Sequence, residues 1–538
     1  MTKQKLSLYW HTLRYMKFIQ IKYRIFYAVR AKYRKKIKFR YSFHKQAESR
    51  HLIFAPGIDA LDSFSKNEGK KRFCFLNLSH TFDKEIDWNY ASLGKLWTYN
   101  LNYFEYLLQQ NMNEEEGIAL INDFIKNIEQ TRDGLEPFPI ALRGINWIKF
   151  LSQHGVRNQN IDDSLYAQYY ILMDNLEYHL LGNHLLENGF SLLFGAYYFQ
   201  DQKLFEQAKE ILFAELHEQI LFDGAHFELT PMYHEIMLFR ILDCYNLMAY
   251  NNVFQDTKLQ NLLKEKAEKM LGWLENILYQ NGSVPHFNDS TENIAPAPQA
   301  LLEYAKRLGL RSNKVPMKES GYRKCVTDCY ELVIDAGNIG PDYIPGHAHS
   351  DTANFELHID QHPVVTDTGI STYEANERRI LERSTKAHNT VVIDGLDQSE
   401  VWSSFRVARR AKVTDRKESK DYICVRHDGY SRIGAIHSRE FYCTEKEIKI
   451  IDIVTSQKKR KYQCCAYIHF APDVKIKDIT ENTIMTKNAI FTFEGLKKLE
   501  LVDITIAKGY NKLIKSKAAK IFFERKLLTL IDVIEPTK

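Results

Sequence analysis

Hydrophobic residues recur at helical spacing through the middle of the chain, from about residue 91 to residue 310. Apolar positions three and four residues apart are typical of amphipathic helices. The pattern predicts helices over 112–128, 142–154, 163–181, 184–200, 202–219, 232–250 and 257–279. Short loops separate these helices, so consecutive helices should be antiparallel. Such a series predicts an α-helical bundle or a closed α/α-toroid.

From about residue 321 the pattern changes to short β-rich runs separated by turns. The predicted strands are 330–335, 354–360, 390–394, 411–414, 422–426, 448–454, 466–470 and 499–506. Many short strands with few helices predict an antiparallel β-sandwich. We place the linker at Arg311–Tyr322, the helical domain at residues 46–315 and the β-domain at residues 316–538.

Residues 1–45 form a separate arm, with a helical pattern over residues 3–40. Residues 1–40 contain 13 Lys or Arg, no Asp or Glu, and many aromatic residues. Such a helix suits an anionic membrane surface, where each basic residue contributes about 1 kcal/mol. A helix docked on the body, with its basic face in water, explains the pattern equally well.

No apolar run reaches the roughly 20 residues that span a bilayer. The stretch from Leu6 to Val29 also lacks the apolar region of a signal peptide, because basic residues interrupt it. We therefore expect the protein to lie in the cytoplasm or peripherally at the inner membrane face.

Composition limits the classes of partner. With 538 residues the chain should form at least two domains. The net charge of +5 depends on the arm: without its 13 basic residues, 60 Lys and Arg remain against 68 Asp and Glu, a net charge of −8. This balance argues against nucleic acid, and an acidic substrate would need basic residues gathered in a cleft. The eight cysteines have no zinc-finger spacing and suit a reducing compartment.

Three histidines and one aspartate mark the ends of predicted strands. His347 and His349 are two residues apart, so they share one face of a strand. Asp367 and His388 stand at the edges of further strand patterns, which could bring them opposite that pair. Two histidines and a carboxylate suit zinc or a similar divalent ion, which leaves one histidine for chemistry. Each histidine taken alone is more simply an ordinary sheet residue.

The sequence around these residues resembles a known family. The segments 346–351 (GHAHSD), 364–369 (VVTDTG) and 384–395 (STKAHNTVVIDG) are similar to the C-terminal half of the heparinase II/III-like polysaccharide lyases. The resemblance extends from about Trp97 to the β-rich end. It implies an incomplete α/α-toroid followed by an antiparallel β-sandwich, and a structural metal, usually zinc and sometimes calcium. We predict His349, Asp367 and His388 as its ligands.

Two helix starts carry the remaining catalytic candidates. In 181–189 (LGNHLLENG), Asn183 could be an ordinary N-cap. In the family, an Asn or His of this motif meets the substrate carboxylate and makes the proton on C5 removable. We predict Asn183 as that residue, with His184 as second choice.

Tyr233 follows Thr230-Pro231, a typical helix start. The positive helix end should favour a tyrosinate, which a phenol of pKa about 10 needs in order to act as a base. A buried core tyrosine is the simpler alternative. Together with the other motifs, Tyr233 is the best single catalytic candidate, and His347 its partner base when the C5 proton lies on the other face of the sugar.

Further residues are predicted to bind substrate. Arg143 could pair with an acidic sugar and Trp147 could stack on a ring, although Trp147 equally suits packing between helices. The loop 285–290 should line the same cleft. The full predicted set is Arg143, Asn146, Trp147, His234, Tyr373 and Arg406.

These features predict a polysaccharide lyase that cleaves a uronic-acid polymer by β-elimination, in polysaccharide production or turnover. Tyr233 would take the proton from C5 and return it to the leaving oxygen. A uronate C5-epimerase needs the same first step and is the alternative enzyme. A non-catalytic glycan-binding scaffold is the alternative from another class, although binding alone does not need a base.

Overall fold

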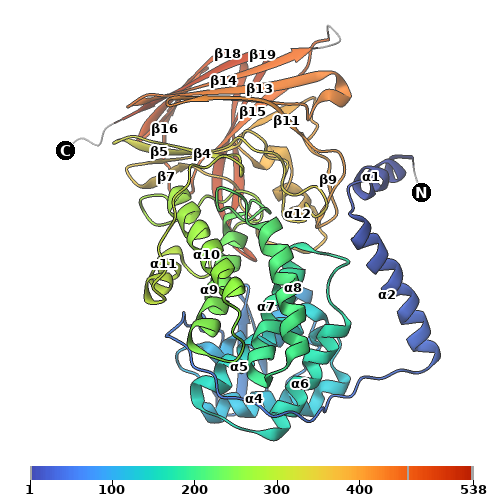
Figure 1. Ribbon diagram of the computed structural model, residues 1–538. Coiled ribbons are helices and arrows are strands. Elements are labelled where there is room, and N and C mark those ends of the chain that lie inside the picture. The colour runs from blue at the N-terminus through green and yellow to red at the C-terminus, as the bar shows by residue number, and fades with distance from the viewer. Residues whose placement is uncertain (1–2, 457–459, 535–538) are drawn as a thin grey trace.

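The computed structural model describes residues 3–456 and 460–534. Helices form one half of the molecule and β-sheets the other, with the N-terminal arm along one side (Figure 1). The change from helices to strands falls between Arg307 and Tyr322. This is the predicted α+β class.

The helical half contains the predicted helices and two that were not predicted, α3 and α11. Its helices are α3 (Lys95–Tyr103), α4 (Glu114–Asn127), α5 (Pro137–His154), α6 (Gln159–Asp174), α7 (Gly182–Phe199), α8 (Gln202–Gln219), α9 (Pro231–Tyr250), α10 (Thr257–Ile277) and α11 (Pro298–Arg307). The predicted helix 163–181 ends earlier, at Asp174. The residues after it form a tight loop, in which the backbone N–H of Glu177 donates to Asn188 Oδ1 (2.9 Å).

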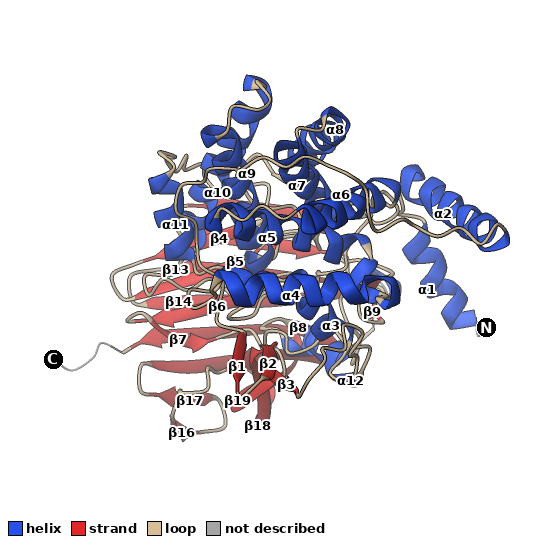
Figure 2. Cartoon of the chain, turned by 90° about the horizontal axis from the view of Figure 1, so that it is seen from below, coloured by secondary structure: helices blue, strands red, loops and turns tan. Residues whose placement is uncertain are grey.

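The order of contacts gives an incomplete α/α-toroid. Helices α3, α5, α7, α9 and α11 pack one against the next as an inner layer. The even-numbered helices alternate with them, and α4 contacts α6 while α8 contacts α10 on the outside. Figure 2 shows this layer of helices over the sheets. The toroid predicted by the family resemblance is confirmed.

The β-domain is a sandwich of antiparallel sheets. Among the described residues the largest sheet has ten strands, and a second sheet has four, in the order β4-β5-β6-β7. Both sheets contribute to one hydrophobic core. The small sheet contains β4 (Tyr322–Val326), β5 (Tyr330–Asp335), β6 (Phe355–Ile359) and β7 (His362–Val365). The large sheet contains β8 (Val391–Ile393), β11 (Val413–Ser419), β12 (Tyr422–His427), β13 (Ala435–Cys443), β14 (Glu447–Ser456), β15 (Cys464–His469), β16 (Ile476–Ile479), β17 (Thr483–Thr486), β18 (Ala489–Gly509) and β19 (Lys512–Val533).

Smaller elements connect the two halves. A three-stranded sheet of β1 (Phe64–Asn67), β2 (Lys70–Phe75) and β3 (Leu78–Phe82) belongs to the helical half. The long β18–β19 hairpin reaches it, because Asn77 Nδ2 donates to the carbonyl of Tyr510 (2.8 Å) at the hairpin tip. The short ribbon of β9 (Val401–Trp402) and β10 (Arg406–Val407) and the helix α12 (Glu377–Glu382) lie on the side of the β-domain that faces the arm (Figure 1).

The arm consists of α1 (Lys3–Leu13) and α2 (Phe18–Lys36), and it is docked on the body. On α1, the Thr12 hydroxyl accepts from Trp402 Nε1 (3.1 Å). On α2, Tyr23 stacks on Tyr178, with ring centroids 4.7 Å apart. The arm therefore bridges the β-domain and the helical domain. Within the described ranges, no helix combines the length and the apolarity needed to span a membrane.

Candidate active site

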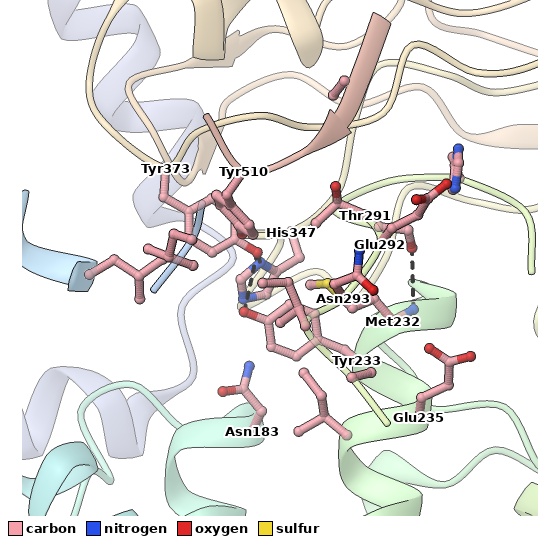
Figure 3. Close-up of a pocket in the computed structure, with 18 of the residues that line it drawn as sticks. Asn183, Met232, Tyr233, Glu235, Thr291, Glu292, Asn293, His347, Tyr373 and Tyr510 are labelled. Carbon is pink, nitrogen blue, oxygen red and sulfur yellow. Dashed lines mark hydrogen bonds between the residues drawn. The ribbon is translucent and has the colours of Figure 1, made fainter. Parts of the chain in front are cut away.

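A large cavity lies where the helical domain, the β-domain and the arm meet. Its volume is about 2110 Å³. Typical small-molecule pockets measure about 300–1,000 Å³, so this cavity can hold a considerably longer ligand. Figure 3 shows the residues at its centre, with Asn183 and Tyr233 on the helical side and His347, Tyr373 and Tyr510 on the β-side.

Tyr233, His347 and Tyr373 form the centre of the site. Thr230 caps α9 by accepting from the backbone N–H of Tyr233 (3.0 Å), which fixes Tyr233 in the first turn. The Tyr233 ring lies against the His347 ring, with centroids 4.0 Å apart. The hydroxyl of Tyr373 is 3.3 Å from that of Tyr233 and 3.4 Å from His347 Nδ1. Three proton-carrying groups from distant parts of the sequence therefore converge.

Asp289 holds His347 in place. Its carboxylate lies 2.8 Å from His347 Nδ1 and 2.8 Å from His349 Nε2. Arg379 donates to both carboxylate oxygens, at 2.5 and 2.7 Å. Burial alone would raise the pKa of Asp289, but the charge of Arg379 and the histidine hydrogen bonds hold it well below its usual range. Because this ionised carboxylate accepts from Nδ1, His347 presents Nε2 as its free acceptor.

Asn183 is tied to a second buried carboxylate. Asn183 Nδ2 donates to both oxygens of Glu228, at 2.9 and 3.1 Å. The same carboxylate lies 3.8 Å from His347 Nε2. The preceding Gly182 has a φ of +60°, and a Cβ there would lie 2.9 Å from Ile344, so the backbone at the start of α7 requires glycine. Asn183 thus sits at the positive end of a helix, close to the histidine.

The other predicted catalytic residue, His184, also lines the cavity. Its Nδ1 is 3.0 Å from Glu177 Oε1. Burial lowers the pKa of His184, but the charge and hydrogen bond of Glu177 outweigh it and raise the pKa above its ordinary value. Asn146, Tyr373 and Arg406 line the cavity as well. All of these residues were predicted to lie at the site.

Three predicted substrate contacts require correction. Arg143 is fully buried and donates to Gln168 Oε1 (2.8 Å) and to backbone carbonyls. Trp147 is fully buried against Phe104, with ring centroids 5.3 Å apart. His234 is buried, and its Nε2 lies 3.0 Å from the carbonyl of Met270. None of the three lines the cavity in the described structure, so their roles are structural.

Burial acts against the expected tyrosinate. Burial raises the pKa of Tyr233 above its ordinary value, with smaller opposing effects that include the hydrogen bond with Tyr373. This direction favours the protonated phenol, a form suited to donating a proton.

The predicted metal ligands lie together behind His347. His388 Nδ1 is 2.7 Å from Asp367 Oδ2, and the His349 and His388 rings are 5.2 Å apart. Among the described residues, no three His, Cys, Asp or Glu side chains are arranged around one point to hold a metal. The donor chemistry nevertheless fits a divalent ion, because His349 Nδ1 and His388 Nε2 are buried and have no hydrogen-bond partner in the described part of the chain.

Several site residues were not predicted. Asp289 lies in the loop 285–290, which was predicted to line the cleft, and Glu228 lies two residues before Thr230. Their acidic character next to predicted catalytic residues was the available signal. Arg379 and Tyr510 carried no such signal, because α12 and the β18–β19 hairpin bring them to the site only in the folded chain. Tyr510 packs edge-on against Tyr373, with ring centroids 5.2 Å apart.

Comparison with known proteins agrees with this architecture. The family model described as heparinase II/III N-terminus matches residues 161–307, and the model described as heparinase II/III-like, C-terminal matches residues 310–528. A heparin-sulfate lyase of Bacteroides stercoris is 27% identical over 264 residues, which cover 41% of this chain and 37% of that protein. The heparin-sulfate lyase of Pedobacter heparinus is 26% identical over 246 residues, which cover 40% and 36%. The matched part thus spans little more than a third of these curated relatives.

Solved structures share the fold. A crystal structure of heparinase III has a TM-score of 0.66 at 16% identity, covering 85% of this chain and 80% of that chain. Heparan sulfate lyase HepC from Pedobacter heparinus has a TM-score of 0.57 at 17% identity, with the same coverage. At these identities the similarity establishes a helical domain followed by antiparallel sheets.

Proposed function

The chain belongs to the heparinase II/III-like family, and we propose that it is a polysaccharide lyase that cleaves a uronic-acid-containing polysaccharide by β-elimination. The observation that carries the proposal is the cluster of Tyr233, His347 and Tyr373, backed by Asp289 and facing Asn183. A cavity of about 2110 Å³ gives room for a polymer. The names of the curated relatives support an acidic polysaccharide of the glycosaminoglycan type as substrate.

The geometry supports a division of labour between the two domains. Asn183, at the positive end of α7, would bind the uronate carboxylate and stabilise the charge that develops on it, which requires its amide to release Glu228. His347 Nε2 would take the C5 proton, because Nδ1 is engaged with Asp289. The released electron pair forms the C4–C5 double bond as the C4–O bond breaks. The neutral phenol of Tyr233 would give its proton to the departing oxygen.

This assignment differs from the sequence-based expectation that Tyr233 removes the proton itself. That route needs a tyrosinate, which burial disfavours. After each turnover His347 carries an extra proton and Tyr233 lacks one. Tyr373, whose hydroxyl lies 3.3 Å from that of Tyr233 and 3.4 Å from His347 Nδ1, would relay a proton from the histidine back to Tyr233. Both routes require Tyr233, so its replacement tests the site rather than the direction of proton transfer.

A divalent metal, zinc or calcium, is part of the proposal as a structural element. His349 and His388 would hold it through their free ring nitrogens, with Asp367 beside them. When bound, the metal would cross-link the strand ends behind His347. No proton transfer in the proposed reaction depends on it.

Contact with an anionic membrane is proposed for the outer face of the arm. Its large apolar side chains are exposed instead of packed, for example Phe18 at 79% and Trp10 at 68%. Lys and Arg side chains flank them, and residues 1–40 contain no acid. Exposed apolar and basic groups on one helix suit an anionic leaflet such as the one that faces the cytoplasm.

The deciding experiment measures elimination directly. Purified protein is incubated with a panel of uronate polymers, and ultraviolet absorbance and chain length are followed. Elimination creates a double bond conjugated with the carboxylate, so absorbance should rise and the polymer should shorten. Tyr233→Phe should reduce turnover by about 10²–10⁴-fold, the usual contribution of general acid–base catalysis, without loss of thermal stability.

The same experiment distinguishes the alternatives. Deuterium uptake at C5 with no absorbance and no shortening would identify a uronate C5-epimerase. Binding without any of these signals would identify a glycan-binding scaffold. The epimerase is less well supported, because the curated relatives named above are lyases.

A further inference from the structure

The inner face of the N-terminal arm forms part of the cavity wall. The residues of the arm that line the cavity lie on one side of α1 and α2 and in the turn between them: Tyr9, Thr12, Leu13, Met16, Gln20 and Arg24. Gln20 is buried, and its Nε2 donates to the carbonyl of Leu180 (3.0 Å), two residues from the start of α7. The arm is therefore anchored beside the helix that carries Asn183.

Two guanidinium groups line this wall. Arg24 comes from α2 and Arg406 from β10, and both line the cavity. The Arg406 guanidinium lies over the rings of Trp402 (4.9 Å) and Tyr9 (5.6 Å), so the α1 helix helps to hold it. Burial, and then the positive charge of Arg406, lower the pKa of Arg24. The positive charge of Arg406 therefore acts on Arg24.

No acidic partner neutralises this pair within the described residues. Three other cations of the cavity are paired: Arg240 with Glu187 (3.2 Å), Lys95 with Glu136 (2.7 Å) and Arg410 with Asp342 (3.0 Å). Neither Arg24 nor Arg406 has a carboxylate within ion-pair distance there. Both side chains are exposed, so water and salt screen their mutual repulsion, and an anion bound by both would neutralise their charge further.

The pair also lies next to the catalytic cluster. Phe405, which directly precedes Arg406, packs against Tyr373 and His347, with ring centroids 5.1 and 5.9 Å apart. On the other side, the charge of Arg24 acts on His179, in the loop that leads to Asn183 and His184. An anion at this pair would thus belong to the same bound chain as the sugar at Tyr233.

We propose that Arg24 and Arg406 form a substrate subsite that binds an anionic substituent, a carboxylate or a sulfate, on a sugar next to the cleaved linkage. This subsite rests on the proposed lyase function. It makes the N-terminal arm part of the substrate-binding cleft, although the arm lies outside both segments that match the family models. Guanidinium groups suit this task because they bind carboxylate and sulfate oxygens through two parallel N–H donors.

The test uses the full-length protein with Arg24→Gln, Arg406→Gln and the double variant. Lys32→Gln is the matched control, because it removes one charge from an exposed position of the same helix that does not line the cavity. The probes are an unsulfated polyglucuronate oligosaccharide and its O-sulfated counterpart. Each single variant should raise KM about tenfold with kcat nearly unchanged, as expected for one charge-assisted hydrogen bond at a partly exposed site. The double variant should raise KM by less than the product of the two single increases, because both groups bind one anion.

Binding measured in a Tyr233→Phe background separates the subsite from catalysis. There, Arg24→Gln and Arg406→Gln should weaken oligosaccharide binding about tenfold relative to Lys32→Gln. A loss limited to the sulfated probe identifies sulfate as the ligand, and an equal loss on both identifies the carboxylate. If both variants bind and turn over like Lys32→Gln, the subsite does not exist. If the wild type binds oligosaccharide through this pair but gives no elimination product, the lyase proposal fails while the subsite stands.

Discussion

At the scale of single residues, Asp289 shows how one buried carboxylate can organise an active site. It accepts from His347, His349 and both ends of the Arg379 guanidinium. These bonds fix which ring nitrogen of His347 carries the proton, and they join the catalytic histidine to the predicted metal ligand. Asp289 touches no reacting atom in the proposed reaction, so it is a positioning residue.

Asp289→Asn should therefore impair catalysis more than binding. An amide can donate to Nδ1 and stabilise the wrong tautomer of His347, so kcat should fall about 10²-fold or more while KM changes little. Thermal stability should also fall, because Arg379 would keep a buried charge without its partner. Asp473→Asn, at another position of the cavity wall, is the control and should change neither quantity. Wild-type kcat in folded Asp289→Asn would refute the role.

Glu215 gives a prediction of pH-dependent stability. Burial raises its pKa from 4.5 to about 7, against a hydrogen bond from Gln219. Between these values the folded protein holds a proton that the unfolded chain releases, so stability falls as pH rises through the window. Above pH 7 the free energy of unfolding is lower by the full amount, at most about 3 kcal/mol.

Glu215→Gln removes this ionisation. It should raise the melting temperature at pH 8 and leave it unchanged at about pH 3, where Glu215 is protonated in both the folded and the unfolded state. Glu206→Gln, at an exposed position of the same helix, should have no such pH-dependent effect. Equal melting of Glu215→Gln and wild type at pH 8 would show that Glu215 is not held neutral.

The helices that hold the site residues were predicted more accurately than the helix face on which each residue lies. On α5, Leu142 and Asn146 line the cavity, while Arg143 and Trp147, one position further along, point into the protein. The two residues of each pair are four positions apart, so each pair lies on one face of the helix. Nearly every residue of this helix is buried, and hydrophobic patterning cannot distinguish a core face from a cavity face. The choice depends on which helices pack beside it.

At the scale of elements, the strand ends behind His347 carry the metal prediction. Protein purified without chelator should contain close to one equivalent of divalent metal by elemental analysis. His349→Ala and His388→Ala should each lose it and melt at lower temperature, because metal binding to the folded state stabilises that state. His286→Ala, a cavity histidine outside the set, should keep the metal. Metal-free wild type that melts like chelator-treated protein would contradict the prediction.

Elements were predicted where local patterning was strong. Helices α7, α8 and α9 were predicted almost to their ends, because caps such as Thr230 and Asp201 are visible in the sequence. Of the β18–β19 hairpin, only the strand 499–506 was predicted, because the exposed stretches of the hairpin lack regular alternation. Its pairing with β14 and β15, and the delivery of Tyr510 to the cavity, depend on tertiary contacts between residues far apart in the chain.

At the scale of the whole molecule, the arm bridges the helical domain and the β-domain and so closes one side of the cleft between them. Its inner side contacts the β9–β10 ribbon and the loop before α7, and it lines the cavity. Deleting residues 1–40, the natural test of a membrane anchor, would therefore also open the cleft. A test of the outer face needs substitutions that leave the inner face intact.

The last prediction uses exposed residues of the outer face only. Trp10→Ser, Phe18→Ser and Ile25→Ser replace side chains that are 68%, 79% and 60% exposed. The wild type should co-sediment with vesicles containing anionic lipid, more strongly at low salt, because basic and apolar groups act together. The triple variant should lose this binding and keep its turnover of a short uronate substrate. Phe222→Ser, 69% exposed on the loop between α8 and α9, is the control and should bind vesicles like the wild type. If the wild type ignores anionic vesicles at low salt, the arm serves the cleft alone, and its apolar face does not bind lipid.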